Sequence, residues 1–157
     1  ITSGLFLLVG IGYERTHDRE IAKMGGWASR TPIYAALFGF FLFASVGLPG
    51  LSGFAGEFLV LLGAFLAHPM VAGASTLVMI LAAVYLLWMY QRIFTGPLSS
   101  FLSGLGSHLT DVTPTEILTL APLAAMIVAF GILPSILTSS FAASVATFLA
   151  AAGSALP

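Results

Sequence analysis

The sequence has no cysteine, so disulfide bridges and thiolate metal sites are excluded. Charged residues are scarce as well. They make up 7% of the 157 residues, whereas a soluble domain carries about 25%. Hydrophobic residues make up 59%, and the mean hydropathy is +1.07. A chain with so few polar groups could not cover a water-facing surface. Soluble enzymes, disordered segments and nucleic-acid binders are therefore excluded, and an integral membrane protein is expected.

Sequence motifs for bound groups are also missing. The three histidines, His17, His68 and His108, are too far apart in the sequence to form a ligand spacing. There is no nucleotide-binding glycine motif and no catalytic triad. We therefore expect no metal and no cofactor to be bound by this chain. The chain begins at Ile1 inside an apolar run with no basic segment before it, so we expect a piece of a longer membrane protein rather than a signal peptide.

Apolar stretches divide the chain into expected helices, because a bilayer core about 30 Å thick needs about 20 apolar residues per crossing. The expected fold is an all-α, polytopic transmembrane helix bundle with one discontinuous (broken) helix. Its parts are a truncated helix 1–13, a cytoplasmic loop 14–30, a broken helix 31–68, a helix 70–94, a loop 95–113, a helix 114–134 and a C-terminal apolar segment 135–157. The last segment fits a further span, a bent continuation or a helix at the membrane interface.

The stretch Gly47-Leu48-Pro49-Gly50-Leu51-Ser52-Gly53 interrupts the third of these parts. A continuous helix through it would lose hydrogen bonds and clash at Pro49. Either a tight turn joins two spans, or Pro49, Gly50 and Gly53 form the hinge of one broken span. The positive-inside rule favours the broken span, because it places Arg92 on the same side as the basic loop. All five basic residues are then cytoplasmic: Arg15, Arg19, Lys23, Arg30 and Arg92.

Glu57 is the only charged residue between Arg30 and Arg92. Ionisable side chains in membrane segments are costly and by default indicate function. Transporters use discontinuous helices to place coupling-ion sites near the middle of the membrane, so we interpret Glu57 as a proton-carrying carboxylate. Two other interpretations stay open: a glutamate that only packs against a neighbouring helix, and a glutamate on an interfacial helix in water.

Two further sets of residues receive weaker predictions. The charged residues of 14–30 are expected to form a solvated loop. His68 ends the segment that carries Glu57; it is more simply a helix stop, with a role as a proton relay as the weaker alternative.

The stretches Gly4–Gly26 and Leu48–Phe65 together resemble a known family, the antiporter-like subunit M (chain 4) of the proton-pumping NADH-quinone oxidoreductase, respiratory complex I. The stretch Val84–Gly96 matches the last helices expected of that family. The resemblance covers the whole chain. It implies two inverted repeats in the full subunit, each with a broken helix, of which the second is seen here.

The resemblance also implies a role for Glu57, since it matches the glutamate of the family's broken helix. The related subunits L and N and the Mrp-type cation/proton antiporters usually carry lysine there, so glutamate indicates subunit M. The implied partners are other membrane subunits, with L and N as neighbours, the lipid bilayer and protons. NADH, FMN, iron–sulfur clusters and quinone would be bound by other subunits. A bacterial inner membrane is the implied location.

Three functional hypotheses follow. The first is a proton-translocating subunit of complex I in which Glu57 carries protons. The second is a subunit of an Mrp-type cation/proton antiporter. The third is a membrane scaffold in which Glu57 only packs.

Overall fold

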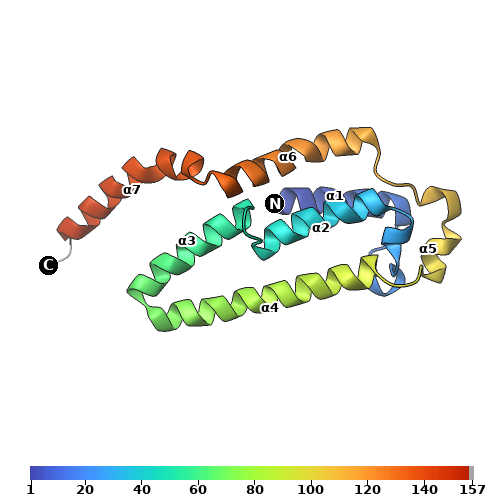
Figure 1. Cartoon of the computed structure of the whole chain (residues 1–157), viewed down its shortest axis with the longest axis horizontal. Coiled ribbons are helices and arrows are strands. Elements are labelled where there is room, and N and C mark those ends of the chain that lie inside the picture. Colours follow the sequence, from blue (N-terminus) through green and yellow to red (C-terminus); the bar gives the residue numbers. More distant parts are fainter. Residues whose placement is uncertain (156–157) are drawn as a thin grey trace.

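The computed structural model describes residues 1–155, with side chains through Ala151, and contains helices but no strand in that range (Figure 1). The long helices are α1 (Thr2–Thr16), α2 (Pro32–Val46), α3 (Ser52–Ala67), α4 (Pro69–Phe94), α6 (Pro114–Ile132) and α7 (Ser135–Ala155). Shorter turns of helix are η1 (Ile21–Lys23), η2 (Trp27–Ser29), α5 (Ser100–Gly104) and η3 (Gly106–His108). The all-α prediction is confirmed.

The predicted broken helix is also confirmed. Helices α2 and α3 follow one another along the length of α4, which runs back in the opposite direction (Figure 1). At 26 residues, α4 is about 39 Å long. Helix α3 packs between α4 and α6, and α2 packs against α1 and α4. Helix α7 extends away from the bundle and contacts α6.

The helix break (Gly47–Leu51) is built from turn chemistry that the sequence encodes. Gly47 ends α2 with a positive φ of 83°, and the backbone N–H of Leu48 donates to the Phe43 carbonyl at 3.0 Å. The N–H of Leu51 then donates to the Leu48 carbonyl at 3.1 Å, with Pro49 and Gly50 between them and Gly50 at φ 92°. Proline followed by glycine is the preference of a type II turn. The chain therefore stops one helix and starts the next within five residues.

Apolar side chains face outward along much of the bundle. Helices α4 and α6 are long and apolar enough to cross a membrane. Leu66 and Met70, at the turn between α3 and α4, are 80% and 89% exposed. Such side chains are stable in lipid or against other helices rather than in water, in agreement with the membrane class expected from composition.

Three predicted segments differ from the structure. The first helix was expected to end at residue 13, where charges begin, but α1 continues to Thr16 because helix hydrogen bonding does not require apolar residues. The expected loop 14–30 is a packed cap rather than a solvated loop: Thr16, Met24 and Trp27 in it are buried. The loop 95–113 contains α5 and η3.

An aromatic cluster joins this cap to the bundle. Phe94 of α4 lies 5.2 Å from Phe38 and 4.7 Å from Tyr90 between ring centroids, and it stacks on Trp27 at 6.1 Å. The Tyr34 hydroxyl donates to the Leu8 carbonyl at 2.8 Å. Aromatic pairs of this geometry stabilise a fold by about 0.5–1.5 kcal/mol each, so the cluster fixes α1, α2 and α4 at one end.

Candidate functional site at the helix break

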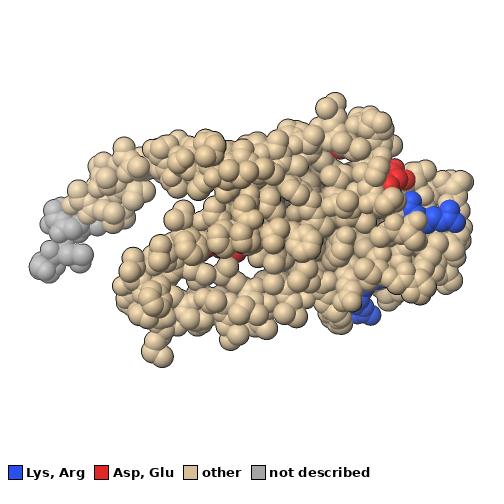
Figure 2. All heavy atoms as spheres, in the orientation of Figure 1, with Lys and Arg blue, Asp and Glu red and all other residues tan. Residues whose placement is uncertain are grey.

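The charged residues divide into two unequal groups. Ten of the eleven lie at one end of the bundle, on the last turns of α1 and α4, the first turn of α6 and the segments between them. They are Glu14, Arg15, Asp18, Arg19, Glu20, Lys23, Arg30, Arg92, Asp111 and Glu116, and we call this region the charged end. Figure 2 shows the lysines and arginines gathered at the end of the molecule where α5 lies. The eleventh charge is Glu57.

Glu57 lies in the second turn of α3 and its side chain reaches back to the helix break. A Cβ atom built on Gly47 would lie 2.6 Å from Glu57 Oε2 and 3.5 Å from its Cδ. The carboxyl group therefore lies directly against the backbone of Gly47, where a side chain would occupy its place. Helix α2 ends and helix α3 begins beside this carboxyl group, which is half-buried.

No hydrogen bond or ion pair holds the Glu57 carboxylate within residues 1–155. Its surroundings are backbone ends. The last carbonyls of α2 carry partial negative charge, and the first N–H groups of α3 carry partial positive charge. Leu51, the N-cap of α3, provides no side-chain cap. The carboxyl group thus lies between helix termini of opposite polarity, without a fixed partner.

The three predicted hinge residues play different parts. Pro49 and Gly50 form the exposed tip of the turn. Gly53 lies in the first turn of α3, and a Cβ built on it would overlap the Ala44 carbonyl oxygen. Glycine at Gly53 therefore allows the start of α3 to pack backbone against backbone on the last turn of α2.

His68 lies away from this site. It serves both as the C-cap of α3 and the N-cap of α4, and its backbone carbonyl accepts from the N–H of Ala72 at 3.1 Å. Eleven residues of helix separate it from Glu57, which is about 16 Å. The structure therefore does not bring His68 and Glu57 together, and the side chain is exposed.

An ionic clamp at the charged end was not predicted from the sequence. Arg15 donates to both carboxylate oxygens of Glu116, at 3.1 and 2.9 Å, and to the backbone carbonyls of Thr110 and Asp111, at 2.7 and 3.1 Å. Its side chain is 10% exposed. Arg15 was predicted to be solvated in the loop; that was wrong, because α1 continues far enough to carry it against α6.

Asp111 extends this clamp to α2. Its carboxylate accepts from the backbone N–H groups of Ile33 and Tyr34, each at 2.9 Å. Thr31, the N-cap of α2, makes no side-chain cap of its own, so an aspartate 77 residues away supplies it. Glu116 also closes a capping box with Thr113. The sequence Thr-x-x-Glu at Thr113 and Glu116 was the local signal for the capping role of Glu116 at the start of α6.

A second ion-pair group lies at the surface of the cap. Lys23 Nζ lies 2.7 Å from Asp18 Oδ2 and 2.7 Å from Glu20 Oε2. The hydrogen bond that Lys23 donates lowers the pKa of the Asp18 carboxyl below its usual value. The carboxylates of Asp18 and Glu20 in turn raise the pKa of Lys23. Both groups are charged at neutral pH, and this pairing holds the turn between α1 and η1.

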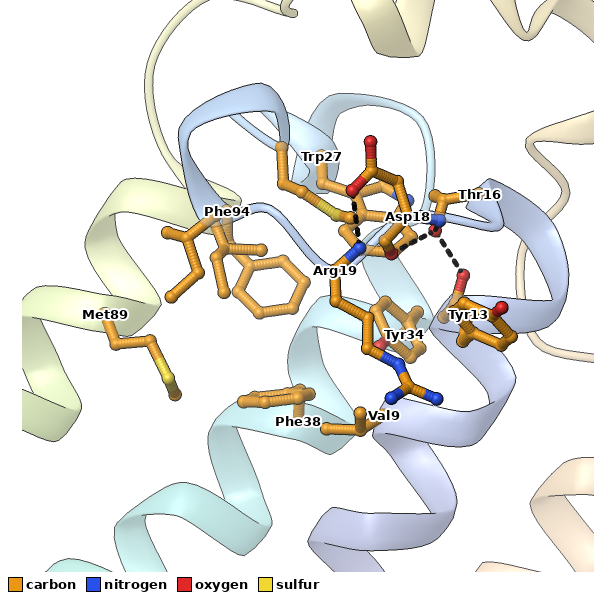
Figure 3. A pocket seen from close by; sticks show the side chains of 14 residues that line it. Val9, Tyr13, Thr16, Asp18, Arg19, Trp27, Tyr34, Phe38, Met89 and Phe94 are labelled. Atoms are coloured by element: carbon orange, nitrogen blue, oxygen red, sulfur yellow. Dashed lines mark hydrogen bonds between the residues drawn. The ribbon is translucent and has the colours of Figure 1, made fainter.

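A cleft of about 200 Å³ opens beside the same cap, between α1, α2 and α4. Figure 3 shows that apolar side chains, Val9, Phe38 and Met89 among them, line its depth, while Arg19 lies beside Tyr13 at its polar rim. The Arg19 guanidinium is 4.5 Å from the Tyr13 ring centroid. Glu57 is not among the lining residues, so cleft and break are separate features. No cluster of three potential metal ligands occurs in the part of the chain that the structure describes.

These features define the class of protein: a polytopic helical membrane protein with a discontinuous helix and a lone carboxyl group at the helix break. The model of the NADH:quinone oxidoreductase/Mrp antiporter transmembrane family matches residues 1–84, more than half of the chain. The chain belongs to this family.

Individual relatives agree with the resemblance to subunit M. NADH-quinone oxidoreductase subunit M of Rhodobacter capsulatus is 46% identical over 93% of this chain, and NADH-ubiquinone oxidoreductase chain 4 of Marchantia polymorpha is 36% identical over 95%. A chain of respiratory complex I from Thermus thermophilus, solved with bound NADH, superposes with a TM-score of 0.76 and 38% identity over 87% of this chain. The chain spans about 28–30% of the length of these proteins.

Proposed function

We propose that this chain is part of a membrane subunit of a proton-translocating NADH-quinone oxidoreductase, equivalent to subunit M, and that Glu57 carries protons within it. One observation carries the proposal. Glu57 is the only charge away from the charged end, it lies at the helix break, and within residues 1–155 nothing pairs with it. Structural charges are normally paired when they leave water, whereas a proton carrier must be free to exchange its proton.

The break supplies what proton exchange needs. Non-helical backbone at membrane depth persists only inside protein or beside water. The free carbonyls of α2 and the free N–H groups of α3 can hydrogen-bond water next to the carboxyl group. A proton then moves from such a water to the Glu57 carboxylate. The neutral carboxyl group later releases the proton to a different water, on the opposite side of the membrane. His68 is a weaker candidate relay, reached only through further water or side chains.

The rest of the proposal follows the resemblance to subunit M. Electron transfer from NADH through flavin and iron–sulfur clusters to quinone takes place in other subunits, and subunits L and N are neighbours of this one. The protein resides in the bacterial inner membrane. The basic residues of the charged end support a cytoplasmic location for that end under the positive-inside rule. Relatives named subunit M or chain 4, rather than Mrp antiporter, favour the oxidoreductase over the antiporter.

The decisive experiment is Glu57→Gln in the assembled complex. Gln keeps the shape of the side chain and removes the exchangeable proton. We expect normal assembly, with proton pumping in membrane vesicles reduced at least about tenfold, equivalent to about 1.4 kcal/mol in the barrier. Unchanged pumping and proton stoichiometry would exclude Glu57 as a carrier. Failure of the complex to assemble would favour the scaffold hypothesis instead.

Sidedness has its own test. Single cysteines at positions 19 and 92, introduced into a subunit without other cysteines, can be labelled with a membrane-impermeant reagent. We expect both to react from the cytoplasmic side. Labelling from opposite sides would contradict the single broken span.

A further inference from the structure

Helix α6 meets the helix break through one glycine. Gly131 lies in the last turn of α6, and a Cβ built there would overlap the carbonyl oxygen of Gly50 and lie 2.5 Å from Leu51 Cα. Real Cβ atoms essentially never come within 3.0 Å of another heavy atom in this way. The backbone of α6 therefore lies directly on the backbone of the turn, and any side chain at 131 would force one of them to move.

The other end of α6 is held in place. Its first turn carries Glu116, paired with Arg15 of α1, and the adjoining Asp111 caps α2. Between the two ends, Leu120 and Ile127 are 1% and 4% exposed. With Gly131 they are spaced seven and four residues apart, so they share one face of the helix. At 19 residues, α6 is about 28 Å long, enough to reach from the charged end to the break.

A displaced break would carry Glu57 with it. The turn at Gly50 and Leu51 leads directly into α3, which carries the carboxyl group, and it follows Gly47, against which that group lies. The contacts at Gly53 and Gly131 are tight backbone-to-backbone contacts, and at Gly47 the carboxyl group of Glu57 lies where a side chain would be. A shift at Gly131 therefore changes the position of the carboxyl group relative to both helix termini.

We propose that Gly131 is a positioning residue: α6, fixed at its first turn by the Arg15–Glu116 pair, holds the turn of the helix break through Gly131 and so sets the place of the Glu57 carboxyl group. This inference rests on the proposed function of Glu57. It assigns a role to a helix that carries no titratable group near the break. Gly131 itself touches no proton-carrying group, so it acts only through the turn.

The test compares Gly131→Ala and Gly131→Val with Gly63→Ala and Gly63→Val. Gly63 also lies within an apolar helix, α3, but a Cβ built there meets nothing within 4 Å. In the assembled complex we expect the Gly131 variants to lower proton pumping by roughly 10- to 100-fold, as misplacement by about 1 Å does elsewhere, with Val worse than Ala. The pH profile of pumping should also shift. The Gly63 variants should leave both unchanged.

A double-variant cycle separates this inference from the proposed function. If Gly131 acts through Glu57, Gly131→Val in the Glu57→Gln background causes no further loss, because the effects are coupled. Independent, multiplying losses would overturn the inference while leaving Glu57 as a carrier. So would Gly131 variants that match the Gly63 variants in rate and pH profile. If Glu57→Gln alone is harmless, the proposed function fails first. Should the Val variant not assemble, the smaller Ala variant decides by the same criteria.

Discussion

The charged end and the helix break treat charge in opposite ways. At the charged end, Arg15 makes five hydrogen bonds and Asp111 caps a helix from a distant segment. At the break, Glu57 has no hydrogen bond or ion pair in the described part of the chain. The same chemical group, a carboxylate, is a structural tie in one region and is left unpaired in the other. This contrast predicts that a charge with fixed partners contributes to stability, whereas the unpaired Glu57 carboxylate contributes to the proposed proton transfer.

Removing a charge is therefore expected to lower stability at the charged end and to lower proton pumping at the break. Stability can be followed by thermal unfolding of the detergent-solubilised full-length subunit, and pumping in membrane vesicles.

Arg15→Met should have the largest effect on stability. It keeps the apolar stem but leaves Glu116 and two backbone carbonyls without their donor. Because the pair is largely but not fully buried, we expect a loss of about 2 kcal/mol, between the values for buried and surface pairs. Arg19→Met is the control: its guanidinium is exposed over Tyr13, and a loss of about 0.5 kcal/mol is expected. If both variants lost the same free energy of unfolding, the Arg15–Glu116 clamp would contribute no more to stability than an exposed contact.

Asp111→Ala should come next. It leaves the N–H groups of Ile33 and Tyr34 unsatisfied, which typically costs about 1 kcal/mol for a lost N-cap. Asp111→Asn keeps an acceptor oxygen and should recover about half of that loss. The unfolding midpoints of the two variants, measured side by side, test this. An Asn variant as unstable as the Ala variant would mean that Asp111 does not stabilise the protein by capping α2.

How far the sequence predicts these two regions depends on how local each feature is. The break was predictable because proline, glycine and their order specify a turn within five residues, and Glu57 was conspicuous because no other charge is near it. The apolar segments predicted their helices to within a few residues. Where a run of apolar residues ended at Tyr13, however, the helix did not, since backbone hydrogen bonds continue through Glu14 and Arg15.

The clamp and the α6 contact could not be predicted in the same way. Arg15 and Glu116 are 101 residues apart, and only the packing of α1 beside α6 brings them together. A charge in a polar stretch gives no sign of its partner, so a solvated loop was the simplest prediction. Gly131 is one glycine among seventeen, and its contact with Gly50 follows from the crossing of two helices that are far apart in sequence.

A smaller effect is expected from Lys23→Met, where both partners are exposed. Lys23 lowers the pKa of Asp18 below its ordinary value of 3.8. A lowered carboxyl pKa contributes stability above pH 3.8, and this contribution is lost as pH falls through the lowered pKa. Without Lys23 the pKa of Asp18 should rise towards 3.8. The carboxyl chemical shift of labelled aspartate measures it, and the signal that disappears in Asp18→Asn is assigned to Asp18. An unmoved titration would contradict the pairing.

The smallest change in stability should come from Glu57→Gln, the variant expected to lose pumping. No partner is left unpaired when the charge is removed, so the free energy of unfolding should change by no more than about 0.5 kcal/mol. Glu116→Gln makes the identical substitution in the clamp and should lose about 1–2 kcal/mol, because it breaks a charge-assisted pair with Arg15. Stability lost equally at both sites would show that Glu57 has a structural partner beyond this chain, and the contrast between a paired and an unpaired carboxylate would then fail.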